Sequence, residues 1–180
     1  MESLKGQLLV SGGALFDPNF RHTVVLVGEH NQAGALGVVL NRPADVAVAE
    51  AVPFLGSLVE PGELLYRGGP VQPDQPVLLA EFTQPELADL LVFGSIGFVV
   101  GDVEPGGLVG VVRARVYAGY SGWGPGQLEG EMEDGSWIVD PARAEDVFTS
   151  APDSLWSSVL ARKGGQYRRL ATMPYDPSVN

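Results

Sequence analysis

The chain has 180 residues, of which 45% are hydrophobic and 18% are charged, and its formal net charge at pH 7 is −11. This length suits one domain with its own core, and the 24 glycines and 14 prolines favour a turn-rich fold over a helical bundle or a disordered chain. The absence of cysteine excludes disulfides, thiol catalysis and cysteine-based zinc sites, and the acidic balance disfavours binding to phosphate backbones and anionic lipids.

The N-terminal sequence does not resemble a signal peptide, because its apolar run, Leu8–Val10, is only three residues long. No segment approaches the run of about 18 apolar residues that a membrane-spanning helix needs. We therefore expect a cytoplasmic protein that does not bind membranes.

Apolar runs separated by turn residues predict strands through the first two thirds of the chain. The run TVVLV at residues 23–27 is typical of a strand that is covered on both faces. A turn at residues 31–34 separates it from the apolar run at 35–40, so we expect an antiparallel pair. Further strands are expected at residues 6–11, 64–66, 76–82, 98–100, 109–120 and 137–139.

Helices are expected mainly in the last third. The clearest has one apolar stripe, which includes Trp156 and Leu160, and ends at Gly164. Elsewhere Asp45 is a suitable N-cap, and Asp140 followed by Pro141 is a typical helix start. The expected helices cover residues 45–55, 84–91, 125–135, a segment that begins at 140, and 152–163. Early strands and late helices indicate an α+β fold, and we find no repeat or linker that would divide the chain.

The stretch GYSGWGPGQLEGE at residues 119–131 is the most glycine-rich motif. Ser121 lacks the glycine that a G-x-S-x-G nucleophile elbow needs two residues later, and a phosphate-binding G-x-G-x-x-G would need glycine at Gln127. We interpret the motif first as a structural corner that buries Trp123. The alternative is contact with a ligand or partner through Trp123, Gln127 and Glu129.

The two histidines, His22 and His30, lie at opposite ends of a predicted strand, so no metal site is expected. Glu29 and His30 could form an acid–base pair only if a turn brought them together, because adjacent strand residues point to opposite faces. The alternative is a His30 that caps a turn by hydrogen bonding.

Charged residues cluster in two places. The acidic cluster, which we expect to be a solvated helix face, consists of Glu129, Glu131, Glu133 and Asp134. The basic cluster holds four of the eleven basic residues and consists of Arg162, Lys163, Arg168 and Arg169. With Tyr167 interleaved, the basic cluster is the best candidate for nucleic-acid contact, and cations at a helix end are the alternative. The net charge of −11 disfavours direct DNA binding.

The chain resembles the YqgE/AlgH family of bacterial proteins over about residues 4–165. The matching stretches, in order, are GQLLVS, LFDPNF, TVVLVGEH, GALGVVLNRP, RGGPV, GYSGWGPGQLEGE and the LW of the last helix. One departure is Ser121, where the family more often has alanine, which further weakens a serine nucleophile.

The resemblance implies a single α+β domain over residues 1–180, with a bifurcated, mostly antiparallel sheet rolled into a partial barrel. The family has no established enzyme activity, cofactor or catalytic residue, so none is transferred to this chain. Some members are labelled transcriptional regulators because of a genetic association with alginate production.

We therefore expect a non-enzymatic protein that binds a small ligand or a protein partner. Its candidate surface consists of loop residues with no obvious packing role: His30, Asn41, Arg42, Gly68, Gly69, Pro70, Trp123, Gln127 and Glu129. Three alternatives stay open. Asn41 and Arg42 could instead satisfy turn carbonyls while the motif closes the barrel. The protein could be a regulator that contacts nucleic acid through residues 162–169, or a hydrolase that uses Glu29, His30 or Glu129.

Overall fold

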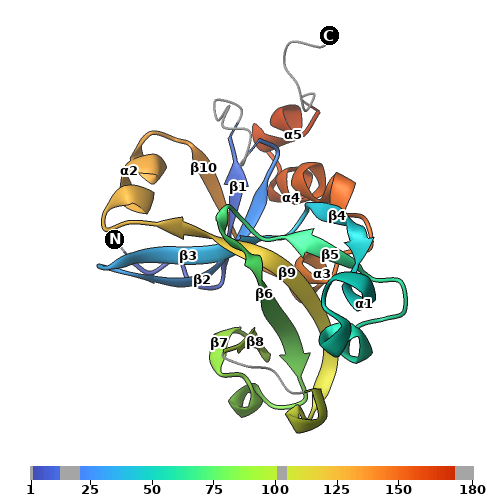
Figure 1. Cartoon of the computed structure of the whole chain (residues 1–180). Coiled ribbons are helices and arrows are strands. Elements are labelled where there is room, and N and C mark those ends of the chain that lie inside the picture. The colour runs from blue at the N-terminus through green and yellow to red at the C-terminus, as the bar shows by residue number, and fades with distance from the viewer. Residues whose placement is uncertain (1, 13–20, 101–104, 173–180) are drawn as a thin grey trace.

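Strand β9 (Val111–Trp123) joins two branches of one mostly antiparallel sheet (Figure 1). The structure is a computed structural model that describes residues 2–12, 21–100 and 105–172, so the LFDPNF stretch lies outside the described residues. One branch has the strand order β10-β1-β2-β3-β9, and the other has the order β9-β6-β8-β7. Strand β5 lies parallel to β9 and also pairs with β4.

The remaining strands are β1 (Gln7–Ser11), β2 (Val24–Asn31), β3 (Gly34–Val39), β4 (Pro43–Ala47), β5 (Leu64–Arg67), β6 (Val71–Phe82), β7 (Leu90–Phe93), β8 (Ile96–Val99) and β10 (Trp137–Pro141). The helices are α1 (Val48–Ala51), α2 (Gln127–Glu133), α3 (Ala144–Val147), α4 (Leu155–Lys163) and α5 (Tyr167–Leu170). Short 3-10 turns are η1 (Pro53–Leu58), η2 (Pro85–Leu87), η3 (Pro105–Gly107) and η4 (Pro152–Ser154). Most helices follow β9, which confirms the α+β class and the concentration of helices late in the chain.

The edge strands β10 and β7 do not pair with each other among the described residues, so the sheet is not closed into a barrel. The bifurcated, mostly antiparallel sheet expected from the resemblance is confirmed. The antiparallel pairing of β2 with β3 is confirmed as well, with His30 opposite Ala35 and Val25 opposite Val39.

Three predicted helices are wrong or much shorter than expected, because strand pairing overrides local propensity. The predicted helix at 45–55 begins instead as β4, which pairs with β5, and only α1 and η1 follow it. The predicted helix at 84–91 is reduced to the turn η2 and is followed by β7, which pairs with β8.

The predicted helix start at Asp140 is also wrong. Asp140 and Pro141 are the last residues of β10 and pair with β1 opposite Leu8 and Gln7. Helix α3 begins three residues after Pro141, and the Arg143 backbone N–H donates to the Asp146 carboxylate over 2.9 Å. A carboxylate that reaches back to the N-cap backbone in this way stabilises the first turn.

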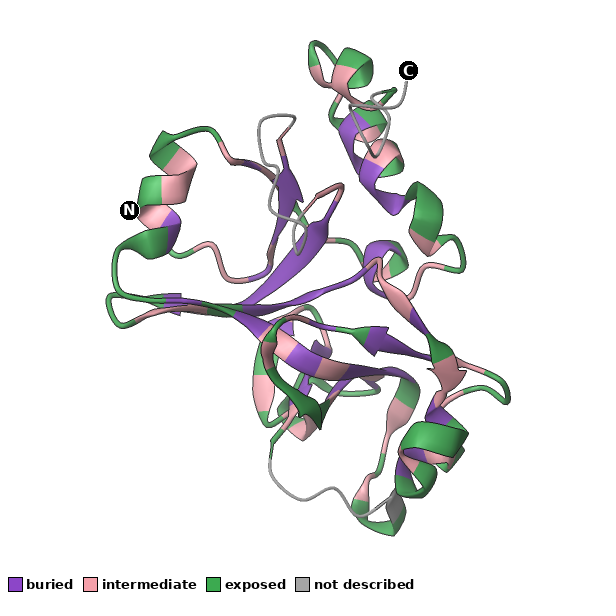
Figure 2. Cartoon of the chain, turned by 45° about the horizontal axis from the view of Figure 1, so that its top comes forward, coloured by how far each residue is buried: buried purple, intermediate pink, exposed green. Residues whose placement is uncertain are grey.

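The strands β1 and β2 are buried on both faces, as expected for their apolar runs. One face packs against Trp156 and Leu160 of α4, and the other packs against Leu128 of α2 and Trp137. Figure 2 shows these strands in the buried colour while the outer faces of the helices are exposed. The residues on the α4 face are Leu8, Val10, Val24 and Leu26, and those on the α2 face are Leu9, Val25 and Val27.

The Gly68–Gly69 segment fills the fork where the two branches separate. The Gly68 carbonyl oxygen accepts hydrogen bonds from Val39 N at 2.9 Å and from Ser121 Oγ at 3.1 Å. The Gly68 N–H donates to Ala118 O over 2.9 Å. A Cβ on Gly69 would lie 2.2 Å from the backbone of Tyr120, so only glycine allows this approach.

We predict that Gly69→Ala lowers the free energy of unfolding by at least about 3 kcal/mol, because the strain of a left-handed residue and the clash with β9 add together. Gly62→Ala is the matched control, since Gly62 also has positive φ but no atom within 4 Å of its added Cβ. It should cost only about 1 kcal/mol. Urea denaturation of both variants measures the difference, and equal losses would show that the fork relaxes easily.

Candidate functional site

The predicted candidate surface divides between the two ends of the β2–β3 hairpin. His30 lies near the turn of the hairpin, where it pairs with Ala35. Asn41 follows β3 at the other end, where its Oδ1 accepts a hydrogen bond from Val24 N over 3.1 Å. The two groups of candidate residues therefore line different hollows of the surface.

His30 connects the N-terminal segment to α2. Its side chain is only 4% exposed. Its Nδ1 accepts a hydrogen bond from Leu4 N over 2.9 Å, and its backbone oxygen accepts one from Ser3 Oγ over 3.1 Å. Its Nε2 is hydrogen-bonded to Oε1 of Glu129. Because Nδ1 accepts from a backbone N–H, the proton of the neutral ring resides on Nε2, which donates to Glu129.

The acid that contacts the His30 ring is thus Glu129, which lies 99 residues away in sequence, and not the adjacent Glu29. Glu29 accepts a hydrogen bond from the His30 backbone N–H over 3.3 Å and lies 3.8 Å from the Lys5 ammonium. Both ring nitrogens of His30 are engaged in bonds that hold segments together. The ring therefore offers no lone pair for a general base in this arrangement.

The His30–Glu129 pair faces a hollow of about 510 Å³, which is lined by Ser3, His30, Asn31, Gln32 and Glu129. The Glu129 side chain is 32% exposed, so its carboxylate is in contact with solvent. The hydrogen bond from His30 lowers the pKa of Glu129 below its usual value. The hollow consequently presents an ionised carboxylate beside two exposed amide side chains, Asn31 and Gln32.

A second hollow of about 450 Å³ lies beside the first, and Asn31 lines both. The second hollow is lined by Glu29, Asn31, Ala33, Gly34, Ala35, Leu36, Val71, Tyr120, Gly122 and Trp123. Leu36 is 38% exposed and Tyr120 is half-buried, so an apolar surface adjoins the amides. We refer to these two hollows together as the hairpin hollows.

Trp123 is only 5% exposed, and its indole N–H donates to a carboxylate of helix α2. Oε1 of Glu131 accepts the indole N–H of Trp123 over 3.1 Å and that of Trp137 over 2.9 Å. The two rings meet edge to face, with centroids 6.2 Å apart. Gln127 donates to the other Glu131 oxygen over 3.0 Å and accepts from Gly124 N over 2.9 Å.

The acidic cluster therefore differs from the solvated face expected from the sequence. Glu131 anchors the two indoles and Glu129 binds His30, whereas Glu133 and Asp134 are exposed. Of the remaining candidate residues, Gly68 and Gly69 lie in the fork of the sheet, and Pro70 directly precedes β6.

Asn41 and Arg42 line a third hollow, of about 520 Å³, at the other end of the hairpin. The Asn41 side-chain amide donates to His22 O over 2.9 Å. The Arg42 guanidinium donates to Arg21 O over 3.0 Å and to Thr23 Oγ1 over 2.8 Å. We refer to this cavity as the arginine hollow, and its lining residues are Arg21, His22, Asn41, Arg42, Pro43, Arg67, Pro152, Asp153, Trp156, Ser157 and Ala171.

The structure divides the basic cluster near the C-terminal end. Arg162 forms ion pairs with Asp140 at 3.0 Å and with Asp146 at 2.9 Å, and the bond to Asp146 is the main reason that its pKa is raised. Lys163 donates to Val139 O over 2.8 Å. Arg168 and Arg169 are exposed on α5, so two of the four cations are committed to contacts within the protein.

Two further observations concern the described parts of the chain as a whole. None of the helices in them is long and apolar enough to cross a membrane. No group of His, Asp or Glu side chains in them is arranged to hold a metal ion.

The AlgH-like family model matches residues 8–168. The chain belongs to the AlgH-like family. A UPF0301 protein of Streptomyces coelicolor is 43% identical over 188 aligned residues, which cover 100% of this chain and 97% of the relative. A UPF0301 protein of Chlorobaculum tepidum is 40% identical over 97% of this chain and 95% of its own.

Two solved structures are similar to this AlgH-like chain along almost its whole length. The crystal structure of a Corynebacterium diphtheriae protein has a TM-score of 0.86 at 28% identity, and the match covers 96% of this chain and 93% of that protein's chain. The solution structure of AlgH from Pseudomonas aeruginosa has a TM-score of 0.71 at 30% identity, and the match covers 96% of this chain and 95% of the AlgH chain. The names of these proteins state no ligand and no reaction.

Sequence reasoning missed that Glu131 accepts hydrogen bonds from two indoles and that Arg67 lies beside Arg42 in this AlgH-like structure. The spacing of four residues between Gln127 and Glu131 was a usable signal, since such side chains meet on one helix face. Buried indole N–H groups also need acceptors, which points to a nearby carboxylate. No local signal places Arg67 beside Arg42, because the two meet through the pairing of β4 with β5.

We predict that Glu131→Ala lowers the free energy of unfolding by about 2–4 kcal/mol, because it leaves two buried indole N–H groups without their acceptor. Glu133→Ala, on the exposed face of the same helix, should change it by no more than about 0.5 kcal/mol. Urea denaturation followed by tryptophan fluorescence measures both values. A loss below 1 kcal/mol for Glu131→Ala, on the order of one neutral hydrogen bond, would contradict the assigned role.

We predict that Glu129→Gln changes the pH dependence of stability. A carboxyl whose folded-state pKa is lowered stabilises the fold above its unfolded pKa, near 4.5, and loses that contribution as pH falls through the folded pKa. The stability difference between the wild type and Glu129→Gln should therefore be constant above pH 4.5 and shrink below it. Denaturant midpoints from pH 7 to pH 3, with Glu133→Gln as control, test this. A difference that stays constant down to the lowest pH would contradict it.

Proposed function

We propose that this AlgH-like protein acts by binding rather than by catalysis, and that the hairpin hollows recognise a positively charged segment of a protein partner. The observation that carries the proposal is the engagement of both His30 ring nitrogens, which leaves Glu129 as a recognition group. With both ring nitrogens bonded, His30 fixes the position of Glu129 but does not itself accept a proton from a substrate.

The chemistry of the hairpin hollows supports a partner that carries a cation. Glu129 is ionised at neutral pH, and only its Oε1 is used by His30. The exposed amides of Asn31 and Gln32 supply donors and acceptors beside it. The partly exposed Leu36 and Tyr120 supply an apolar contact, and polar groups around an apolar centre are typical of protein interfaces.

The hydrolase alternative has less support. Ser121 is fully buried and its Oγ donates to Gly68 O, which makes it a structural group of the fork. The nucleic-acid alternative rests on Arg168 and Arg169, since Arg162 is paired with acids. The net charge of −11 opposes an approach to phosphate backbones.

Site-specific photo-crosslinking in cells tests the proposal. A photoreactive residue at Gln32 should give one discrete protein adduct, and a photoreactive residue at Glu86, which lies exposed on η2, should not. Adding Glu129→Gln should reduce the Gln32 adduct by about tenfold, as expected for the loss of one charged contact. Adding Glu133→Gln should leave it unchanged.

Three outcomes would contradict the proposal. The first is that photoreactive residues at Gln32 and at Glu86 give the same adducts, or that the one at Gln32 gives no adduct. The second is an enzymatic activity of the purified protein that His30→Ala abolishes. The third is retardation of DNA at about 50 mM salt that is lost on substitution of Arg168 and Arg169, which would favour the nucleic-acid alternative.

A further inference from the structure

The arginine hollow collects positive charge in a chain whose net charge is −11. Among the described residues that line it are three of the eleven basic residues, Arg21, Arg42 and Arg67, and one acidic residue, Asp153. We propose that the arginine hollow binds the oxyanion of a small molecule, either a phosphate or a carboxylate group. This site lies apart from the hairpin hollows and does not depend on the function proposed for them.

One backbone hydrogen bond and two bonds from the Arg42 side chain connect the three segments that carry the arginines. Arg21 precedes β2, Arg42 follows β3, and Arg67 ends β5. The Arg67 backbone N–H donates to Arg42 O over 2.8 Å, and the Arg42 guanidinium donates to Arg21 O and Thr23 Oγ1. These bonds fix the Arg42 guanidinium and the backbone of Arg67, so part of the site is ordered before an anion binds, which lowers the ordering cost of binding.

Arg67 differs from several arginines elsewhere in the protein. Arg113, Arg115 and Arg162 each form an ion pair with a carboxylate at about 3 Å. The Arg67 guanidinium is exposed, and it makes no ion pair or hydrogen bond with the other side chains that the structure describes. A planar guanidinium presents parallel N–H donors that match the geometry of a phosphate or a carboxylate.

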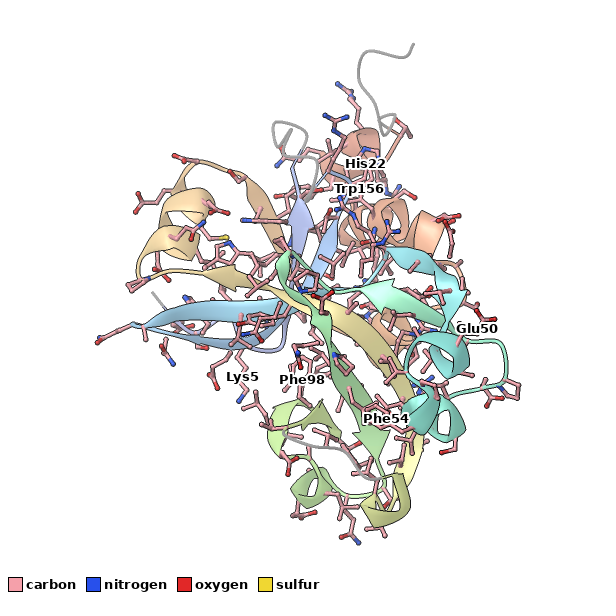
Figure 3. All side chains as sticks on the ribbon, viewed as in Figure 1. Lys5, His22, Glu50, Phe54, Phe98 and Trp156 are labelled. Atoms are coloured by element: carbon pink, nitrogen blue, oxygen red, sulfur yellow. The ribbon has the colours of Figure 1, made fainter. Side chains whose placement is uncertain are left out.

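His22 and Trp156 form an aromatic wall of the hollow. Their rings stack with centroids 3.7 Å apart and an interplanar angle of 9°, and Figure 3 shows the two residues together beside α4. Trp156 is buried and donates its indole N–H to Ser11 O over 2.9 Å. His22 adopts the left-handed conformation with a φ of 49°, which is unusual for a residue other than glycine. The stack and the bond from Asn41 to His22 O hold it there.

The electrostatics of His22 supply an internal probe of the site. Burial, and to a smaller extent the neighbouring Arg21, lower the pKa of His22 below its usual value. A bound oxyanion would favour the imidazolium and raise this pKa. Of the residues that the structure describes, the charged ones that line the hollow with His22 are Arg21, Arg42, Arg67 and Asp153.

The size and lining of the hollow fit a small molecule. A volume of about 520 Å³ lies within the usual range for small-ligand pockets. Pro43, Pro152 and Ala171 supply apolar walls, and Asp153 can accept a hydrogen bond from a hydroxyl or amino group. The ligand would therefore carry one oxyanion on a short, partly apolar body.

Calorimetric titration of the full chain with inorganic phosphate, and separately with acetate, tests the proposal and distinguishes the two oxyanions. At least one probe should bind saturably. Arg67→Ala should weaken that binding by about tenfold or more, because it removes a charged hydrogen bond. Arg168→Ala removes the same charge from α5, outside the hollow, and should change the affinity by less than about twofold.

Proton NMR of the two histidines supplies a second readout. Saturation with the anion should raise the pKa of His22 and leave the chemical shifts of the His30 ring protons unchanged. The proposal is overturned if neither probe binds saturably up to about 10 mM, well above typical small-ligand affinities. It is also overturned if Arg67→Ala and Arg168→Ala weaken binding equally, or if both histidines shift alike. Because none of these variants touches Gln32 or Glu129, a failure here leaves the crosslinking result unaffected.

Discussion

The close approach of Gly68 and Gly69 to β9 is the constraint on which the rest of the structure depends. The Gly68 carbonyl oxygen serves both β3 and β9, and its N–H donates to the same β9 strand. A side chain at Gly69 would occupy the position of the Tyr120 backbone. This contact lets one long strand belong to two branches of a sheet, and it continues directly from β5, which lies parallel to β9.

The fork also determines where the surface hollows lie. With β2 and β3 anchored beside it, the hairpin extends away so that its turn meets α2 and its open end meets α4 and η4 (Figure 1). The turn end is acidic and rich in amides, whereas the open end is rich in arginine. The hairpin hollows and the arginine hollow therefore lie at opposite ends of one hairpin and differ in the charge of the side chains that line them.

The polar side chains inside the protein are used mainly as structural links. Glu131 holds two indoles, and His30 joins the N-terminal segment to α2. The buried Arg115 donates to Glu63 and to the backbone oxygens of Val147 and Thr149. Each of these groups would cost free energy if it were left without a partner, since a buried polar group must replace its bonds to water.

Local sequence patterns suffice to predict the α+β class, the buried strands β1 to β3 and helix α4, because apolar periodicity and turn residues are local properties. Residues 43–47 and 140–141 are strands because their long-range pairing with β5 and β1 outweighs helix-start signals. The partners of His30 and Arg42 likewise follow from the folded arrangement. Glu129 and Arg67 reach them through strand pairing across long separations, which no local pattern encodes.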